Sequence, residues 1–189
     1  MSGKIGVACV LLIALCAGAL ARSQSTGHAI IGEIRKVDRE AGKIVVKTAD
    51  GTEETFKFTG KTTVRGLKEG GKVAALTGRE GSYVVVHYVG EGTEKTAVGI
   101  EHIGKDAPKV IEGVVVGVGK AAHTVVVKTP AGAEETLHLT KRCMVDTGKG
   151  VVKGTEYTAK EGEHVTVHYT EAGGRKVAHL LKHIGKELY

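Results

Sequence analysis

The chain has few aromatic residues, and this scarcity determines what its cores are made of. Of its 189 residues only 4% are Phe, Tyr or Trp, and Trp is absent. The cores must therefore be built mainly from Val, Ile and Leu. Few rings remain on which bases could stack, which is how proteins commonly hold single-stranded nucleic acid. We therefore expect no nucleic-acid partner.

Cysteine is also scarce, with three in the whole chain. Cys9 and Cys16 lie in an N-terminal segment with the pattern of a removable signal, so the mature chain keeps only Cys143. A single cysteine cannot form an internal disulfide. Because no Cys-His pair is indicated by spacing, we expect Cys143 to be a buried or idle thiol and not a nucleophile.

No motif for a known kind of catalysis is present. Gly60-Lys61-Thr62 resembles the end of a phosphate loop, but Thr55 stands where that loop needs a glycine. Glu53-Glu54 and Glu134-Glu135 are paired carboxylates. Neighbours on a strand point to opposite faces, so neither pair can flank one substrate bond as in a hydrolase. We therefore expect a protein without enzymatic activity.

Residues 1–21 have the order of a secretory signal. A lysine is followed by an apolar run from Ile5 to Leu15 and then by small residues that end at Ala21. We expect cleavage after Ala21, with Ala19 as the second choice. The apolar segment is too short to cross a bilayer, which takes about 20 residues. The sequence thus predicts a secreted or periplasmic protein with no transmembrane span in the mature chain.

Internal repetition is the strongest feature of the sequence. Val84-Val85-Val86-His87-Tyr88 returns as Val165-Thr166-Val167-His168-Tyr169, at an offset of 165 − 84 = 81. At that offset, residues 29–105 and 110–186 align without a gap and share 30 identities in 77 positions. Chance would give only a few identities, so the chain contains a duplicated unit.

The repeat predicts two small domains after the signal, residues 28–105 and 109–189, joined at Asp106-Ala107-Pro108-Lys109. Each domain is close to the smallest size at which one hydrophobic core is stable by itself. We therefore expect the two copies to stabilise each other by packing together.

Each copy is predicted to fold as short strands separated by turns. The 28 glycines and the many Thr and Val residues favour strands and tight turns over helices. Alternation places Phe56 and Phe58 on one face, and likewise the inner valines of the repeated pentapeptide, whose histidine then points outward. The final segment of each copy also fits a helical spacing, but its short hairpin loop favours a strand. The expected strands lie at 30–37, 43–48, 55–59, 84–88 and 95–103 and at their counterparts, with one more short strand around 73–77 and 156–160.

Five or six short antiparallel strands would leave exposed edges in an open sheet, and closure into a barrel removes them. We therefore predict an all-β protein of two tandem small antiparallel β-barrels. The order of strands and turns that supports this is Gly32-Glu33-Ile34, Val37-Asp38, Lys43-Ile44-Val45-Val46-Lys47, Thr55-Phe56-Lys57-Phe58, Glu80-Gly81 and Val84-Val85-Val86-His87-Tyr88.

This order resembles the small OB-like barrels of exported bacterial proteins, which include uncharacterised repeat domains and the periplasmic copper-binding chaperones of metal efflux systems. Those chaperones bind metal through a His, Met residues and a Trp on their second and third strands. This chain has no Trp and carries Thr55, Lys57, Thr136 and His138 on its third strands. The resemblance implies the fold and not the copper site.

A different metal site is suggested by the histidines of the second copy. His164, Thr166 and His168 share one face of their strand. If the hairpin turns about residues 172–173, His179 lies opposite Thr166 and between the two other imidazoles. Three imidazoles on one face suit zinc, copper or nickel. A slip of one residue disperses them, and solvated surface histidines are then the alternative.

The net charge of +6, or +5 without the lysine of the signal, is modest and is interleaved with glutamate. It indicates a solvated surface, with a preference for anionic polymers or membranes as the alternative. We therefore expect an exported, non-enzymatic tandem β-barrel protein with a binding or structural role in the cell envelope. Its partner would be an envelope protein or an anionic polymer. The alternative is a periplasmic metal-binding protein that uses His164, His168 and His179.

Overall fold

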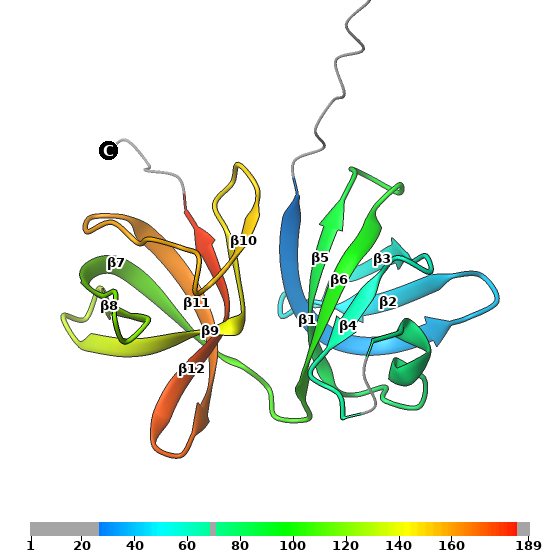
Figure 1. Cartoon of the computed structure of the whole chain (residues 1–189), viewed down its shortest axis with the longest axis horizontal. Coiled ribbons are helices and arrows are strands. Elements are labelled where there is room, and N and C mark those ends of the chain that lie inside the picture. The colour runs from blue at the N-terminus through cyan, green and yellow to red at the C-terminus, as the bar shows by residue number, and fades with distance from the viewer. Residues whose placement is uncertain (1–26, 69–70, 185–189) are drawn as a thin grey trace, which may run out of the picture.

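The computed structural model describes residues 27–68 and 71–184, which form two β-barrels connected by a short linker (Figure 1). The predicted signal segment, residues 1–21, lies outside this part of the chain. Within the described ranges no helix is long and apolar enough to cross a membrane.

The predicted fold class is confirmed, because strands make up nearly all of the regular structure. The first barrel consists of β1 (His28–Asp38), β2 (Lys43–Lys47), β3 (Glu53–Lys57), β4 (Thr63–Arg65), the 3-10 helix η1 (Val73–Leu76), β5 (Tyr83–Val89) and β6 (Thr96–Gly104). The second consists of β7 (Lys109–Gly119), β8 (Thr124–Lys128), β9 (Glu134–Asp146), β10 (Val151–Lys153), β11 (His164–Ala172) and β12 (Arg175–His183).

Both sheets close on themselves with equivalent topology. The first has the order β3-β2-β1-β5-β6-β4 and closes through a parallel pairing of β3 with β6. The second has the order β10-β9-β12-β11-β7-β8 and closes through β8 and β9. In the second barrel one long strand, β9, takes the positions that β3 and β4 occupy in the first. The duplication seen in the sequence is therefore also a duplication of strand order.

The seam of each barrel carries the same three-residue clasp. In the first barrel the Lys95 ammonium pairs with Glu54 and lies 5.6 Å from the centre of the Tyr88 ring. The counterparts at an offset of 81 make the same contacts in the second barrel, where Lys176 pairs with Glu135 and lies 5.4 Å from the centre of the Tyr169 ring. The clasp joins the start of the last strand to the third strand, where the sheet closes.

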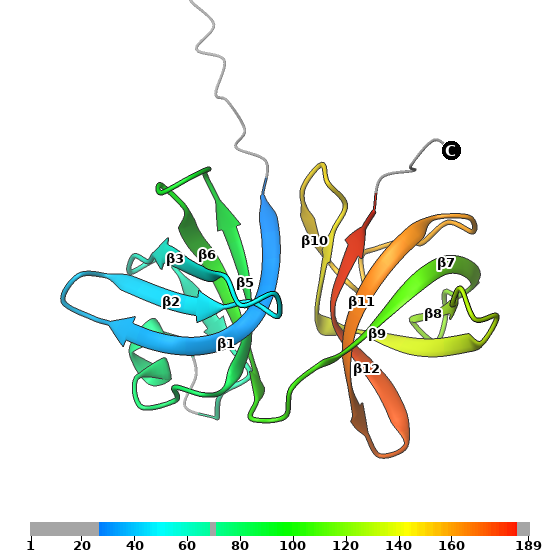
Figure 2. The ribbon, with the colours of Figure 1, turned by 180° about the vertical axis from the view of Figure 1, so that it is seen from behind.

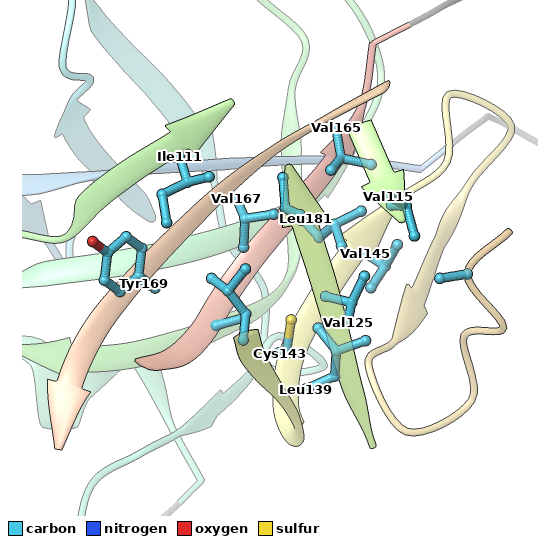
Figure 3. Close-up of a cluster of buried hydrophobic side chains, with 14 residues drawn as sticks. Ile111, Val115, Val125, Leu139, Cys143, Val145, Val165, Val167, Tyr169 and Leu181 are labelled. Atoms are coloured by element: carbon cyan, nitrogen blue, oxygen red, sulfur yellow. The ribbon is translucent and has the colours of Figure 1, made fainter. Parts of the chain in front are cut away.

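Each barrel encloses its own aliphatic core, as the low aromatic content predicts. The first contains Phe56 with valines and isoleucines of β1, β2, β5 and β6. In the second, Val165, Val167 and Tyr169 of β11 all point inward, toward the same core as Leu139 of β9 (Figure 3). The inward direction predicted for the alternate residues of the repeated pentapeptide is confirmed.

A glycine shared by both copies sits at a point of close approach. A Cβ on Gly32 would lie 2.4 Å from the Lys47 carbonyl oxygen, and one on Gly113 would lie 2.2 Å from that of Lys128. The first and second strands of each barrel therefore cross too tightly at this point for any side chain.

Two of the predicted short strands are wrong. Residues 73–76 form η1, in which the buried side chains of Val73 and Leu76 lie one turn apart and pack against the core of the first barrel. Residues 156–160 form a turn and an irregular segment, where Tyr157 packs against the core of the second barrel. The extra short strands are β4 and β10, which lie earlier in the chain.

The last segment of each copy is a strand, as predicted. Its helix-like spacing has a physical cause in the second copy. A bulge in β12 lies between Ala178 and Leu180, and the strand is buried on both faces beyond it. Leu181 enters the barrel core while Leu180 points to the other barrel.

The two barrels share a third apolar cluster where they meet. Its fully buried members are Ala29 and Ile31 of β1, Val85 of β5 and Leu180 of β12. Partly buried side chains complete it, namely Ile103, Met144 and Val151. The outer face of the first barrel around β1 thus packs on β12, β9 and β10 of the second, as both ribbon views show (Figures 1 and 2).

Polar contacts fix the same junction. The Ala29 backbone N–H donates to Asp146 Oδ2 at 3.0 Å, and His28 Nδ1 lies 3.8 Å from the same oxygen. Arg142 pairs with Glu101 and donates from Nη2 to the His102 carbonyl oxygen at 2.8 Å. The expectation that the two copies pack together is therefore confirmed.

Candidate functional site

The structure does not produce the predicted three-histidine cluster. The β11–β12 hairpin turns at residues 173–174, where Ala172 faces Arg175. This turn lies later than the assumed one, so Thr166 faces Lys182 and not His179. The register on which the cluster depended is wrong.

The three histidines have different surroundings. His164 is exposed at the start of β11, opposite Val114 of β7. His168 is half-buried between the barrels, and burial lowers its pKa to about 4. His179 is buried in the bulge of β12, where its Nε2 lies 2.8 Å from Thr170 Oγ1 and burial lowers its pKa to about 4. Among residues 27–68 and 71–184, no three His, Cys, Asp or Glu side chains are grouped to hold a metal ion.

The histidines that both copies share near the end of the last strand have a structural role. His102 Nε2 lies 3.1 Å from Ser82 Oγ, and His183 Nε2 lies 2.6 Å from Tyr157 Oη. Tyr157 also donates to Glu163, the counterpart of Ser82. Each pair connects the last strand of its barrel to the loop before β5 or β11. The recurrence of the histidine in both copies was the feature of the sequence that singled it out.

Cys143 is buried in the core of the second barrel, as expected. Burial raises the pKa of its thiol to about 12. A thiol with so high a pKa is not a nucleophile at neutral pH.

A concave site between the barrels was not anticipated from the sequence. It is a groove of about 300 Å³ with walls from β4 and β6 of the first barrel and from β9 and β10 of the second. Its lining residues are Thr63, Arg65, His87, Val98, Gly99, Ile100, Glu101, Lys141, Arg142, Cys143, Met144, Val151, Val152, Lys153 and Glu156. A site of this kind needs both copies, because neither barrel alone supplies both walls.

The groove carries an excess of positive charge. Two of its four cationic side chains are balanced, since Arg142 pairs with Glu101 and Lys153 Nζ lies 3.0 Å from Glu156 Oε1. The other two, Arg65 and Lys141, are exposed and form no ion pair with any residue that the structure describes. They belong to different barrels, so the groove presents one free cation on each wall.

Exposed valines lie beside these cations. Val98 of β6 is 42% exposed and Val152 of β10 is 37% exposed, and both line the groove. Each is one of the few large apolar side chains left open to solvent in the described chain. The groove therefore combines free cations with apolar contact surface on both walls.

Glu101 forms the floor of the groove at the junction. It is 1% exposed, and its Oε2 has no hydrogen-bond partner among the residues described. Burial raises the pKa of this carboxyl, and the Arg142 guanidinium opposes the rise. His87 lies beside it with a pKa lowered by burial.

The fold defines a protein of two tandem small β-barrels. No family model and no curated protein matches the chain. Among solved structures it is similar to apo-CusF residues 6–88 from Escherichia coli, with 17% identity over 45% of this chain and 96% of that chain and a TM-score of 0.33. It is also similar to silver-bound CusF residues 10–88 from the same organism, with 18% identity over 43% of this chain and 96% of that chain and a TM-score of 0.31.

Proposed function

We propose that this protein is an exported, non-enzymatic binding protein of the cell envelope, and that its ligand is an anion with an apolar part. The observation that carries the proposal is the inter-barrel groove. It places one free cation on each wall, Arg65 and Lys141, beside the exposed valines Val98 and Val152.

This combination favours one class of ligand. A groove with low-dielectric walls strengthens the attraction of its cations for an anion relative to an open surface. The valines offer apolar area that a small inorganic anion cannot cover but an organic anion can. The volume of about 300 Å³ is at the lower end of the range typical for small-molecule sites.

The proposal that the protein is not an enzyme is supported by the chemistry of the lining. The Glu101 carboxylate is paired with Arg142, and its second oxygen has no hydrogen-bond partner among the described residues. The lining thus supplies binding groups without an activated nucleophile or a positioned general base.

The proposal is tested with 8-anilinonaphthalene-1-sulfonate, which has an apolar body and one anionic group. We expect the dye to bind the folded protein with a fluorescence increase that weakens as salt is added. N-phenyl-1-naphthylamine, which lacks the sulfonate, is the matched control ligand and should bind more weakly.

Charge reversal in the groove gives the decisive comparison. We expect Lys141→Glu or Arg65→Glu to weaken dye binding about tenfold or more, because each removes a charge-assisted contact. Lys128→Glu, at an exposed position of β8 outside the groove, makes the same charge change and should leave the affinity nearly unchanged. Equal affinities for Lys141→Glu and Lys128→Glu would overturn the assignment of the site.

A further inference from the structure

One wall of the groove is an open sheet edge. β10 is the outermost strand of the second sheet, paired on one side with β9. Thr147 N–H donates to the Gly150 carbonyl at 3.0 Å and Gly154 N–H donates to the Cys143 carbonyl at 2.8 Å. These bonds bracket Val152, which faces Val145.

The alternation of an antiparallel ladder then decides where the remaining backbone groups point. Thr147 and Gly150 form a hydrogen-bonded pair, as do Cys143 and Gly154, so the pair between them, Val145 and Val152, is hydrogen-bonded as well. The backbone N–H and C=O groups of Val151 and Lys153 therefore point away from β9. The Lys153 carbonyl accepts from the N–H groups of Glu156 and Tyr157. The N–H and C=O of Val151 and the N–H of Lys153 have no backbone partner in the part of the chain that is described.

The first barrel has a reduced version of this edge. There Val64 forms an isolated antiparallel bridge with Gly71, which is the counterpart of the Val145–Val152 pair. In the second copy the glycine has become an exposed valine and the bridge has become a three-residue strand. The three-residue strand at this edge belongs to the second copy, where it lines the groove.

We infer that the ligand of the groove is an extended acidic segment of another protein, which pairs with β10 through main-chain hydrogen bonds. This inference rests on the proposed function and narrows the ligand class. Carboxylates on the segment would meet Arg65 and Lys141, and an apolar side chain would lie between Val98 and Val152. Successive side chains of a strand point to opposite faces, so a sequence that alternates acidic and apolar residues fits both.

The edge is what distinguishes a peptide from other organic anions. A lipid headgroup or a glycan can satisfy the cations, but only a peptide backbone offers alternating N–H and C=O groups at the spacing of a strand. A peptide strand is therefore the partner that can bind both the unpaired backbone groups of β10 and the cations of the groove.

The inference is tested with a labelled acetyl-peptide of alternating Glu and Val, measured by fluorescence anisotropy against the mature protein. Two versions are N-methylated on alternate residues, one set along each edge of the strand. A segment that pairs through one edge loses affinity, by about tenfold or more, when one set is methylated and keeps it when the other is. Equal affinities for the two versions would overturn the inference.

A backbone substitution gives the complementary test. Val151→Pro removes the outward N–H and leaves the β9–β10 ladder intact, because proline is tolerated where the N–H faces away from the sheet. We expect peptide affinity to be about tenfold or more lower for Val151→Pro than for Val151→Ala, which keeps the N–H, while the two variants bind the sulfonated naphthalene dye alike. Dye binding with no preference between the peptides would reject the strand pairing and keep the proposed function. Failure of both ligands to bind would reject the proposed function itself.

Discussion

At the scale of single residues, the histidines of the second barrel make its stability sensitive to acid. His168 and His179 have pKa values lowered by burial from 6.5 to about 4. Between about pH 6.5 and pH 4 the unfolded chain binds protons at these positions while the folded chain does not. The free energy of unfolding is therefore unaffected by these groups above pH 6.5 and falls as the pH drops toward 4.

We expect the loss to be on the order of 2 kcal/mol for each imidazole at the acidic end. Urea unfolding at several pH values between neutral and acidic measures it. His179→Gln should reduce the dependence on pH, whereas His164→Gln, at an exposed position, should leave it as in the wild type. The same pH dependence in both variants would contradict this origin.

Calorimetric titration with zinc and copper salts tests the metal-binding alternative. The observed register does not place His179 between His164 and His168. We therefore expect His179→Ala and the wild type to give the same heats. A heat that is lost in His179→Ala and retained in His123→Ala would restore the three-histidine site.

At the scale of secondary-structure elements, the clasp at each barrel seam should contribute measurably to stability. The side chains of Lys95 and Glu54 are only 17% and 27% exposed, so their ion pair is better shielded from water than a surface pair. We expect Lys95→Ala to lower the free energy of unfolding by about 1–2 kcal/mol, because it leaves Glu54 half-buried and unpaired.

Lys176→Ala should have a similar effect in the second barrel, where the same contacts recur. Lys109 is the matched control, because its pair with Glu171 at 2.9 Å is exposed and should contribute less to stability than the seam pairs. Chemical denaturation of the three variants makes the comparison, and equal effects at the seam and at the surface would refute the role of the clasp.

The strands were predictable from the sequence because each alternates over a half-buried surface that the duplication presents twice. The inward direction of the Phe56 and Val165 side chains follows from this alternation. The positions of η1 and β10 were not predictable, since three or four residues carry too little periodicity. The bulge at Ala178–Leu180 shifts the register by one residue without any mark in the sequence, and with it the expected partner of His179.

The candidate site escaped sequence reasoning for a different reason. Arg65 and Lys141 belong to different copies and do not align with each other at the offset of 81. Their approach depends on how one barrel docks on the other, which no pattern within a single copy encodes. What the sequence did contain was the departure of the second copy from the first, such as Leu180 for Gly99 and Met144 for Thr63.

At the scale of the whole molecule, those departures follow the contact between the barrels. Leu180 is fully buried in the junction, whereas Gly99 lines the groove. In the first barrel, Ile31 and Val85 are buried in the junction. In the second, Glu112, which aligns with Ile31, is exposed. The two copies have thus diverged where one covers the other.

We expect Leu180→Ala to lower the free energy of unfolding by about 2–4 kcal/mol, because it opens a cavity in a cluster that both barrels share. It should also separate the unfolding of the two barrels, so that calorimetry shows two transitions where the wild type shows one. Val116→Ala, at a 37% exposed position, is the control and should leave the transition in place. A midpoint for Leu180→Ala equal to that of the control would contradict a shared cluster.

The way the barrels dock has a consequence for assembly. The surfaces that meet are different faces of the same fold, and a head-to-tail contact of this kind can in principle add further units without limit. The corresponding face of the second barrel carries Glu112 and Thr166 where the first barrel has Ile31 and Val85. A third barrel, or a second molecule, would have to bury that charge and those polar groups without partners. These differences therefore disfavour the docking of a further unit on this face in the way that the two barrels dock on each other.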